Sequence, residues 1–529
     1  MSILNKFRLF LRRYILLFLL LSITLFSRYL LLKDQVIPFS FDHGKDSLAI
    51  MDMWLNRSPK LIGPWTSIPG LFFGPAWYYL LLPFYILFEG NPVGGAWAMV
   101  LLVLLQIILA YKYLGRIEAI IIAGSAFYVT ISTSAWNPFP MAFLSLLILI
   151  VLKQISQRNK LGLIQAFVLG SAAALGFHFS TAFAILYPVL IAASLYYRRV
   201  KLKISHFLVL GFGFAWPFIP QLIFELRHNF VESKAIFNYL LHGGASEWSF
   251  DKVAIVLNSL IQETNHFILP NFIFESYAWT IFTNIALMIL LIKVAAIWHR
   301  RSILEKKSLS QYLSMPFEYG LWLILPFVAF SFLHFNVWYI YALAPIFVMI
   351  LADILRIVPK RWSVLVLLCF MAAPLIKADY FIHREQQELM QNARFLPKQL
   401  EIIDHLRTLS RGEPFSVYHY ANDVYDFSYQ YLYFYQALHG QKLPVEFSYK
   451  QDTTDYVVQK SDLMAYFTAN HSESFHQSQE NLHYFYLIEK PLSERLLNEW
   501  WTRVPKSEKI ILQHPYTANL TLHYEVFND

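Results

Sequence analysis

Long apolar runs constrain this chain more than any other feature. The sequence has 529 residues, of which 57% are hydrophobic and 15% charged, well below the roughly 25% of charged residues in a soluble domain. Several runs approach or exceed the ~18 apolar residues that span a bilayer as a helix. The pattern predicts an all-α polytopic membrane protein over most of the chain.

Short basic clusters between the apolar runs set the predicted topology. The basic segment 1–13 precedes the first span, 14–32, and keeps its start in the cytoplasm. The apolar segment 76–88 is too short to cross, so we interpret it as an interfacial or re-entrant helix. About eleven crossings then result, and every short basic cluster falls on the cytoplasmic side. The other expected crossings are 93–111, 117–133, 139–152, 161–178, 181–197, 205–223, 278–297, 318–334, 338–355 and 362–378.

These charges also exclude some classes of protein. The net charge of +8 does not indicate a nucleic-acid partner, because Lys and Arg fall in short clusters between apolar runs. The single cysteine, Cys369, lies inside an apolar run and suggests neither an intramolecular disulfide nor thiol chemistry. We expect a multi-pass protein of the plasma (inner) membrane, with a cytoplasmic N-terminus and lipids around its spans.

The composition changes near Asp379. A helix-like run, 386–409, is followed by strand-like runs at 414–420 and 482–487, with charged and turn residues between them. This pattern indicates a small soluble α/β domain outside the membrane. The predicted domains are a membrane domain (1–378), whose first outer loop (33–92) carries juxtamembrane helices, and an extracytoplasmic domain (379–529).

The segment after the first span concentrates ionisable groups. Within Phe41-Asp42-His43-Gly44-Lys45-Asp46, the five residues 42–46 include two carboxylates, an imidazole and an ammonium. Ionisable groups gathered at one end of a membrane helix usually serve a polar or charged ligand. The predicted topology places further polar side chains on the same outer face, namely Asn137, His178, Glu225, Arg227, His228 and His334.

At this point the sequence resembles the GT-C glycosyltransferases, in particular the bacterial relatives of protein O-mannosyltransferases and of aminoarabinose transferases. Those enzymes carry an Asp just after helix one, then juxtamembrane helices and a Pro-rich aromatic segment. Asp42 matches the Asp, and Lys45 stands where the relatives have a basic residue. Gly74-Pro75-Ala76-Trp77-Tyr78-Tyr79 matches the second segment. The resemblance covers about 1–375, by layout rather than by identity.

The resemblance implies an inverting transfer of a sugar from a polyprenyl-phosphate donor to a hydroxyl on an outer-face glycan, lipid or protein. The leaving phosphate needs no strong acid, so one base and a cation suffice, unlike the carboxylate pair of glycoside hydrolysis. We assign Asp42 as the base, with Asp46 orienting the acceptor or Lys45. Either Asp could instead cap an interfacial helix. Lys45 and Arg227 are candidates for the donor phosphate.

Further candidates for substrate contact have structural alternatives. Trp77 and Tyr78 could line a prenyl groove or anchor the interfacial helix. Glu225 could pair with Arg227 or a lipid headgroup, and His178 could be a hydrogen-bonded residue at a helix end. The candidate substrate contacts are His43, Trp77, Tyr78, Asn137, His178, Glu225 and His228.

A divalent cation is a further expectation. Some relatives bind one through a Glu just before the Pro-rich segment, where this chain has Phe72-Phe73. A hard-cation site could still form from carboxylates and an imidazole if the fold brings them together. Its candidate ligands are Asp42, Asp46, His178 and Glu225.

Three other functions stay open at this point. A flippase or transporter would carry ionisable groups near the middle of its spans, often in duplicated halves, and this chain shows neither. An O-antigen ligase or polymerase would rely on Arg and His in one large central outer loop. A non-catalytic scaffold would only present the C-terminal domain.

Overall fold

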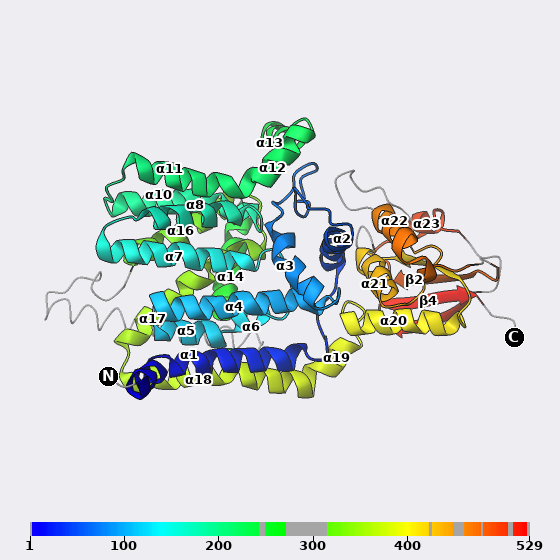
Figure 1. The fold of residues 1–529 in the computed structure, drawn as a ribbon, viewed down its shortest axis with the longest axis horizontal. Coiled ribbons are helices and arrows are strands. Elements are labelled where there is room, and N and C mark those ends of the chain that lie inside the picture. Colours follow the sequence, from blue (N-terminus) through cyan, green and yellow to red (C-terminus); the bar gives the residue numbers. More distant parts are fainter. Residues whose placement is uncertain are drawn as a thin grey trace. The chain divides into compact units, whose positions relative to one another are not determined.

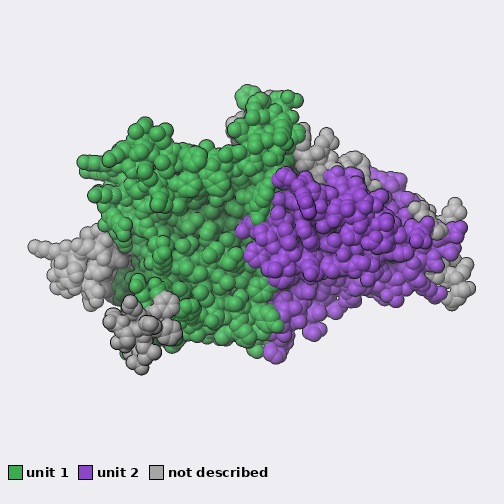
Figure 2. All heavy atoms as spheres, in the orientation of Figure 1, with its two compact units in different colours: residues 1–30, 60–79, 96–380 green, residues 31–59, 80–95, 381–529 purple. Residues whose placement is uncertain are grey.

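The structure is a computed structural model that describes residues 3–242, 249–270, 315–422, 426–447, 460–477, 480–505 and 511–525. It contains two compact units, coloured separately in Figure 2. Unit 1 consists of residues 1–30, 60–79 and 96–380. Unit 2 consists of residues 31–59, 80–95 and 381–529, so it joins part of the predicted first outer loop to the C-terminal residues. The domain division at 378 stays a prediction.

Unit 1 is built from helices (Figure 1). Its α-helices are α1 (Ile3–Leu32), α4 (Val93–Tyr113), α5 (Arg116–Gly124), α6 (Ala126–Thr130), α7 (Pro140–Arg158), α8 (Leu163–Gly176), α9 (Thr181–Ala184), α10 (Leu186–Tyr197), α11 (Ile204–Ala215), α12 (Ile219–Arg227), α13 (Val231–His242), α14 (Phe250–Ile268), α16 (Pro316–Phe332), α17 (Ala344–Ile357) and α18 (Lys360–Tyr380). Two 3-10 segments, η1 (Trp216–Phe218) and η3 (Val337–Leu343), precede α12 and α17.

Six helical stretches in the described part of the chain are long and apolar enough to cross a membrane. They are Arg13–Leu32, Val93–Tyr113, Pro140–Arg158, Ile204–Arg227, Val337–Ile357 and Lys360–Met390. Shorter apolar helices include Ala76–Leu87, which forms where a short helix was predicted. The chain is therefore an integral membrane protein. The predicted crossing 278–297 lies outside the described residues, and the count of about eleven crossings stays a prediction.

Two elements predicted as continuous are interrupted. The run 117–133 forms α5 and α6 with Ser125 between them. At the end of α5, Gly124 meets the backbone of α18 so closely that a Cβ there would lie 1.8 Å from the Phe370 carbonyl oxygen. The predicted helix 386–409 is α19 (Gln386–Met390) and α20 (Leu396–Leu409).

The break before α20 ties the C-terminal residues to the chain that follows the first span. The Phe39 amide donates to the Arg394 carbonyl at 2.9 Å, and the Leu396 amide donates to the Ile37 carbonyl at 3.0 Å. A continuous helix would use these backbone groups internally. The interruption therefore holds the start of the Asp42 segment within unit 2.

Unit 2 combines helices with one sheet (Figure 1). Its helices are α2 (Phe41–Leu55), α19, α20, α21 (Phe427–Leu438), α22 (Lys460–Asn470) and α23 (Glu494–Trp501), and α3 (Ala76–Leu87) begins in unit 1 and ends in unit 2. The strands are β1 (Phe415–Tyr420), β2 (His483–Glu489), β3 (Ile511–Thr517) and β4 (Leu520–Glu525). The strands predicted at 414–420 and 482–487 are confirmed as β1 and β2.

The sheet has the order β1-β2-β4-β3, with β1 parallel to β2 and the other pairs antiparallel. Side chains on a strand alternate between the two faces of its sheet. Tyr418 and Tyr420 pack with Trp500 of α23 on one face. His419 points to the other face, where its ring contacts Tyr429 of α21. The sheet is therefore covered by helices on both faces.

Candidate functional site

The Asp42 segment forms the first turn of α2. Ser40 is the N-cap, and its amide donates to Nδ1 of His43 at 3.3 Å. Burial lowers the pKa of His43 to about 4, with Asp42 acting against this shift and Lys45 adding to it. His43 is therefore neutral near pH 7, and in this structure it completes the capping of the helix.

Asp42 is the more accessible carboxylate of the segment. Its side chain is 48% exposed, and its Oδ1 lies 2.9 Å from Nζ of Lys45, which is 6% exposed. Asp46, one turn later, is buried. A carboxylate in the first turn of a helix is favoured by the helix dipole. The segment thus presents one accessible carboxylate backed by a buried ammonium.

Gly44 explains the glycine inside this motif. A Cβ at Gly44 would lie 2.3 Å from the Ser428 amide nitrogen and 2.4 Å from the Phe427 carbonyl carbon. Only a residue without a side chain lets α2 pack this closely on the start of α21. The sequence motif therefore encodes a helix contact as well as charges.

Asp42 also lines a cavity of about 250 Å³ inside unit 2. The other lining residues come from the segment before α2, from α20 and its preceding turn, from α21 and from three strands. Among them are His419, Asp426 and Tyr429. None of these three stands out in the sequence, because each lies far along the chain from Asp42.

In unit 1 the second predicted segment is built around His178. Its Nδ1 accepts a hydrogen bond from the Ala76 amide at 3.2 Å. A Cβ at Gly74 would lie 2.1 Å from this Nδ1, so the glycine of the motif makes room for the imidazole. The imidazole therefore holds the start of α3.

Three further predicted residues support the same junction. Trp77 is fully buried, and its ring meets Phe179 edge-on at 6.4 Å between centroids. Asn137 donates through Nδ2 to the Phe179 carbonyl at 3.1 Å. Tyr78 is also buried. The structure therefore brings Trp77, Asn137 and His178 together in one packed region of unit 1.

The predicted Glu225, Arg227 and His228 lie at the end of α12. Glu225 is buried and accepts hydrogen bonds from the amides of Glu232 at 2.7 Å and Ser233 at 2.9 Å, which begin α13. His228 donates through Nδ1 to the Phe224 carbonyl at 2.8 Å. Arg227 is exposed. Glu225 and His228 therefore shape the α12–α13 turn, and Arg227 is the accessible group.

Glu232 is a residue that sequence reasoning missed. Its Oε1 accepts the Phe72 amide at 3.1 Å, so it places a carboxylate beside the two phenylalanines that precede Gly74. Burial raises the pKa of Glu232 to about 7, and Glu225 adds to the rise while the Phe72 amide and Gln221 oppose it. No sequence signal marked it, because 160 residues separate Glu232 from Phe72.

The four proposed cation ligands are divided between the two units. Asp42 and Asp46 belong to unit 2, whereas His178 and Glu225 belong to unit 1. Among the described residues, no group of three or more His, Cys, Asp or Glu side chains is placed to hold a metal ion. The divalent cation stays a prediction.

The comparison with known proteins rests on structure. No family model and no curated protein matches the sequence. Two crystal structures of ArnT from Cupriavidus metallidurans match, one in the apo state and one bound to undecaprenyl phosphate. The TM-scores are 0.57 and 0.56 respectively, each at 11% identity over 96% of this chain and 97% of that one. The chain has the fold of ArnT.

This likeness confirms the GT-C fold that the Asp42 segment and the Gly74–Tyr79 segment predicted. The match extends over the C-terminal residues as well, which the sequence resemblance did not cover. At 11% identity the likeness describes the fold.

Proposed function

We propose that this protein is an inverting glycosyltransferase of the outer face of the plasma (inner) membrane. It moves a hexosyl or pentosyl group from a polyprenyl-phosphate donor to a hydroxyl on a cell-envelope glycan, a lipid or a protein. The observation that carries the proposal is the ArnT fold over 96% of the chain, together with the binding of undecaprenyl phosphate by ArnT itself. The accessible carboxylate at the first turn of α2 supplies the reactive group that such a transfer needs.

Asp42 is the proposed base. Its carboxylate takes the proton of the acceptor hydroxyl while the oxygen attacks the anomeric carbon and the bond to the phosphate breaks. One displacement inverts the configuration, and the phosphate leaves as an anion without an acid. Its half exposure and its place at the cavity leave room for an acceptor beside it. Asp46, which is buried, would act by positioning α2.

Positive charge is needed where the phosphate departs. Arg227 is exposed at the end of α12 and can contact a phosphate through two N–H groups. Lys45 already contacts Asp42, so its proposed role is to balance the carboxylate and to attract the phosphate. Trp77, Tyr78, Asn137, His178, Glu225 and His228 would act by holding the segments around the donor.

The proposal includes the predicted topology. The N-terminus lies in the cytoplasm, about eleven helices cross, and the Asp42 segment and the C-terminal residues lie outside. Reporter fusions just after the first span and at the C-terminus test this topology. A cytoplasmic location of the Asp42 segment would contradict it, because the proposed transfer takes place on the outer face.

The deciding experiment is a transfer assay with radiolabelled polyprenyl-phosphate sugars and envelope membranes as the source of acceptor. Asp42→Asn should lower transfer by at least about 100-fold, the effect expected for the loss of a general base. The matched control is Asp34→Asn, which changes an exposed carboxylate of the same unit and should leave transfer within about twofold. Equal activity of Asp42→Asn and wild type, at equal protein level, would refute the assignment.

The same preparation separates the alternatives. A flippase would move the labelled lipid across vesicles without transferring its sugar. An O-antigen ligase-like or polymerase-like transferase would transfer a preassembled glycan, and its activity would not depend on Asp42.

A further inference from the structure

The cavity beside Asp42 carries more buried polar groups than its packing uses. His419 is 2% exposed, Asp426 is 4% exposed and Tyr429 is 9% exposed, and all three line the cavity. Nδ1 of His419, Oδ2 of Asp426 and the hydroxyl of Tyr429 have no hydrogen-bond partner among the described residues. A polar atom that is buried without a partner destabilises the folded protein, because it has lost its hydrogen bonds to water. Three of them in one cavity indicate that a ligand supplies the partners.

The known contacts of these side chains fix their orientation. Gln430 donates to Oδ1 of Asp426 at 2.6 Å, which leaves Oδ2 for another group. Nε2 of His419 lies 3.3 Å from the Tyr433 hydroxyl, which leaves Nδ1. The rings of His419 and Tyr429 stack at 4.2 Å between centroids. The three groups are therefore held in place before any ligand arrives, which lowers the entropic cost of binding.

The charges of the lining decide the class of ligand. Asp42, Asp426 and Glu489 contribute three carboxyl groups against one guanidinium, that of Arg394. This balance disfavours a phosphate and favours hydroxyl or amino groups. Burial raises the pKa of Asp426 to about 7, with Gln430 opposing the rise, so its carboxyl can accept or donate a hydrogen bond near neutral pH. A ring with several hydroxyl groups fits such a mixed set of donors and acceptors.

The size of the cavity narrows the choice. A volume of about 250 Å³ corresponds to roughly eight water molecules at ~30 Å³ each. That is enough for one sugar ring and too little for a glycan chain or a prenyl tail. The lining also comes entirely from unit 2, so none of it comes from the long apolar spans of unit 1.

We propose that this cavity is an acceptor subsite that binds one neutral or amino-bearing sugar ring, with His419, Asp426 and Tyr429 as its hydrogen-bonding residues. The inference rests on the proposed transferase function, because it is the proximity of Asp42 that makes the bound ring an acceptor. Binding of a sugar ring at this place orients a hydroxyl toward the carboxylate of Asp42. The C-terminal residues thereby contribute to acceptor specificity.

The test is ligand-observed saturation-transfer NMR on the full-length protein in a detergent without a sugar headgroup. The probes are methyl glucopyranoside, methyl glucosaminide and glucose 6-phosphate. Wild type should transfer saturation to at least one of the first two and not to the phosphate. Tyr429→Phe, which removes only the unpartnered hydroxyl, should weaken that binding about fivefold, the effect of one hydrogen bond. Asp426→Leu should weaken it at least about tenfold.

The matched control is Tyr466→Phe, which removes a tyrosine hydroxyl from α22 in the same unit but outside the cavity. Its binding should equal that of wild type. The proposal is overturned if wild type binds neither glycoside at tens of millimolar, or if Tyr429→Phe, shown to be folded by its melting curve, binds as wild type does. Glycoside binding by a wild type that transfers no sugar from any lipid donor would instead refute the proposed function and leave the sugar site standing.

Discussion

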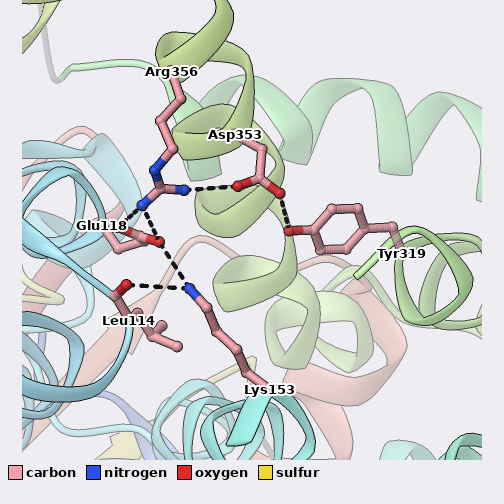
Figure 3. A network of polar contacts seen from close by, with 6 residues as sticks. All are labelled: Leu114, Glu118, Lys153, Tyr319, Asp353 and Arg356. Atoms are coloured by element: carbon pink, nitrogen blue, oxygen red, sulfur yellow. Dashed lines mark hydrogen bonds and ion pairs between the residues drawn. The ribbon is translucent and has the colours of Figure 1, made fainter. Parts of the chain in front are cut away.

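Two polar clusters of this protein differ in how completely their buried groups are paired. The Glu118 cluster of unit 1, drawn in Figure 3, consists of Glu118, Lys153, Tyr319, Asp353 and Arg356. Arg356 contacts both Glu118 oxygens through Nη2, and one Asp353 oxygen through Nη1, each at 2.7 Å. Tyr319 donates to the other Asp353 oxygen at 2.6 Å. In the cavity of unit 2, by contrast, three buried side chains each leave a polar atom without a partner among the described residues.

The difference separates a cluster that stabilises the fold from a cluster that serves a ligand. The Glu118 cluster joins α5, α7, α16 and α17, and each carboxylate in it contacts an opposite charge. Removing one partner of such a cluster leaves a buried charge behind. The cavity residues lie in a small α/β unit that could have placed apolar side chains there. Their unpaired atoms therefore lower stability unless a ligand binds.

The largest expected effect tests the paired cluster. Glu118→Ala should lower the stability of the protein by about 3–5 kcal/mol, because it leaves the buried ammonium of Lys153 without a carboxylate, while Arg356 keeps its contact with Asp353. The measurement is thermal unfolding of the purified protein in detergent. The control is Glu499→Ala, which breaks an exposed pair with Arg495 and should cost at most about 1 kcal/mol. Similar losses of stability for both variants would show that Glu118 contributes no more to stability than an exposed ion pair does.

The Glu118 cluster also shows what the sequence could not reveal. Lys153 and Arg356 belong to the short basic clusters between apolar runs, which predict only the cytoplasmic side. In the structure they contact a carboxylate that a single sequence cannot pair with them, since Glu118 and Arg356 are 238 residues apart. Arg198 contacts Glu318 in the same way, with Nε 2.6 Å from Oε1. The distribution of Lys and Arg predicts on which side of the membrane a loop lies. Which carboxylate each of these side chains contacts depends on the packing of the helices.

The fold could be predicted where one local pattern decides it. Apolar runs gave most helices, and alternating runs gave β1 and β2. The breaks at Ser125 and before α20 could not be predicted, because the backbone at each break pairs with distant residues, 269–270 in the first case and 37–39 in the second. The glycines of the two motifs were visible in the sequence. Their reason, close contact with α21 and with His178, was not.

The candidate site was predictable only in its first part. Asp42 stood out because a charged segment follows an apolar run. Glu232, His419, Asp426 and Tyr429 have no local motif. These four residues are recognised as candidates only from their burial and from their contacts with residues far along the chain, and only the structure shows these features.

The prediction of intermediate size concerns Glu232, a buried carboxylate whose pKa is raised by burial and by Glu225. Because burial raises the pKa of Glu232 from 4.5 to about 7, the folded protein binds this proton more tightly than the unfolded chain does. Stability therefore falls as the pH rises from about 4.5 to about 7 and stays lower above that. Glu232→Gln should equal wild type near pH 4.5 and be more stable by up to about 3 kcal/mol near pH 8.

Melting curves between pH 4.5 and pH 8 measure this difference. The control is Glu494→Gln, an exposed carboxylate of α23, which should follow wild type at every pH. A gain for Glu232→Gln that does not change with pH would contradict a titrating Glu232. A loss at every pH would show that the carboxylate itself, through its contact with the Phe72 amide, stabilises the segment before Gly74.

The smallest effect bears most directly on the comparison between the clusters, because it concerns two buried hydroxyls of one unit. The Tyr85 hydroxyl lies 2.7 Å from the hydroxyl of Ser47, whereas the Tyr429 hydroxyl has no partner among the described residues. Tyr85→Phe should therefore lower stability by about 1 kcal/mol, and Tyr429→Phe should leave it unchanged or raise it by about 0.5 kcal/mol. Thermal unfolding without added sugar measures both. If Tyr429→Phe destabilises the protein as Tyr85→Phe does, its hydroxyl is a structural group. A variant that is at least as stable as wild type but binds sugar less well would instead show that this hydroxyl is kept for the ligand, at a cost to the fold.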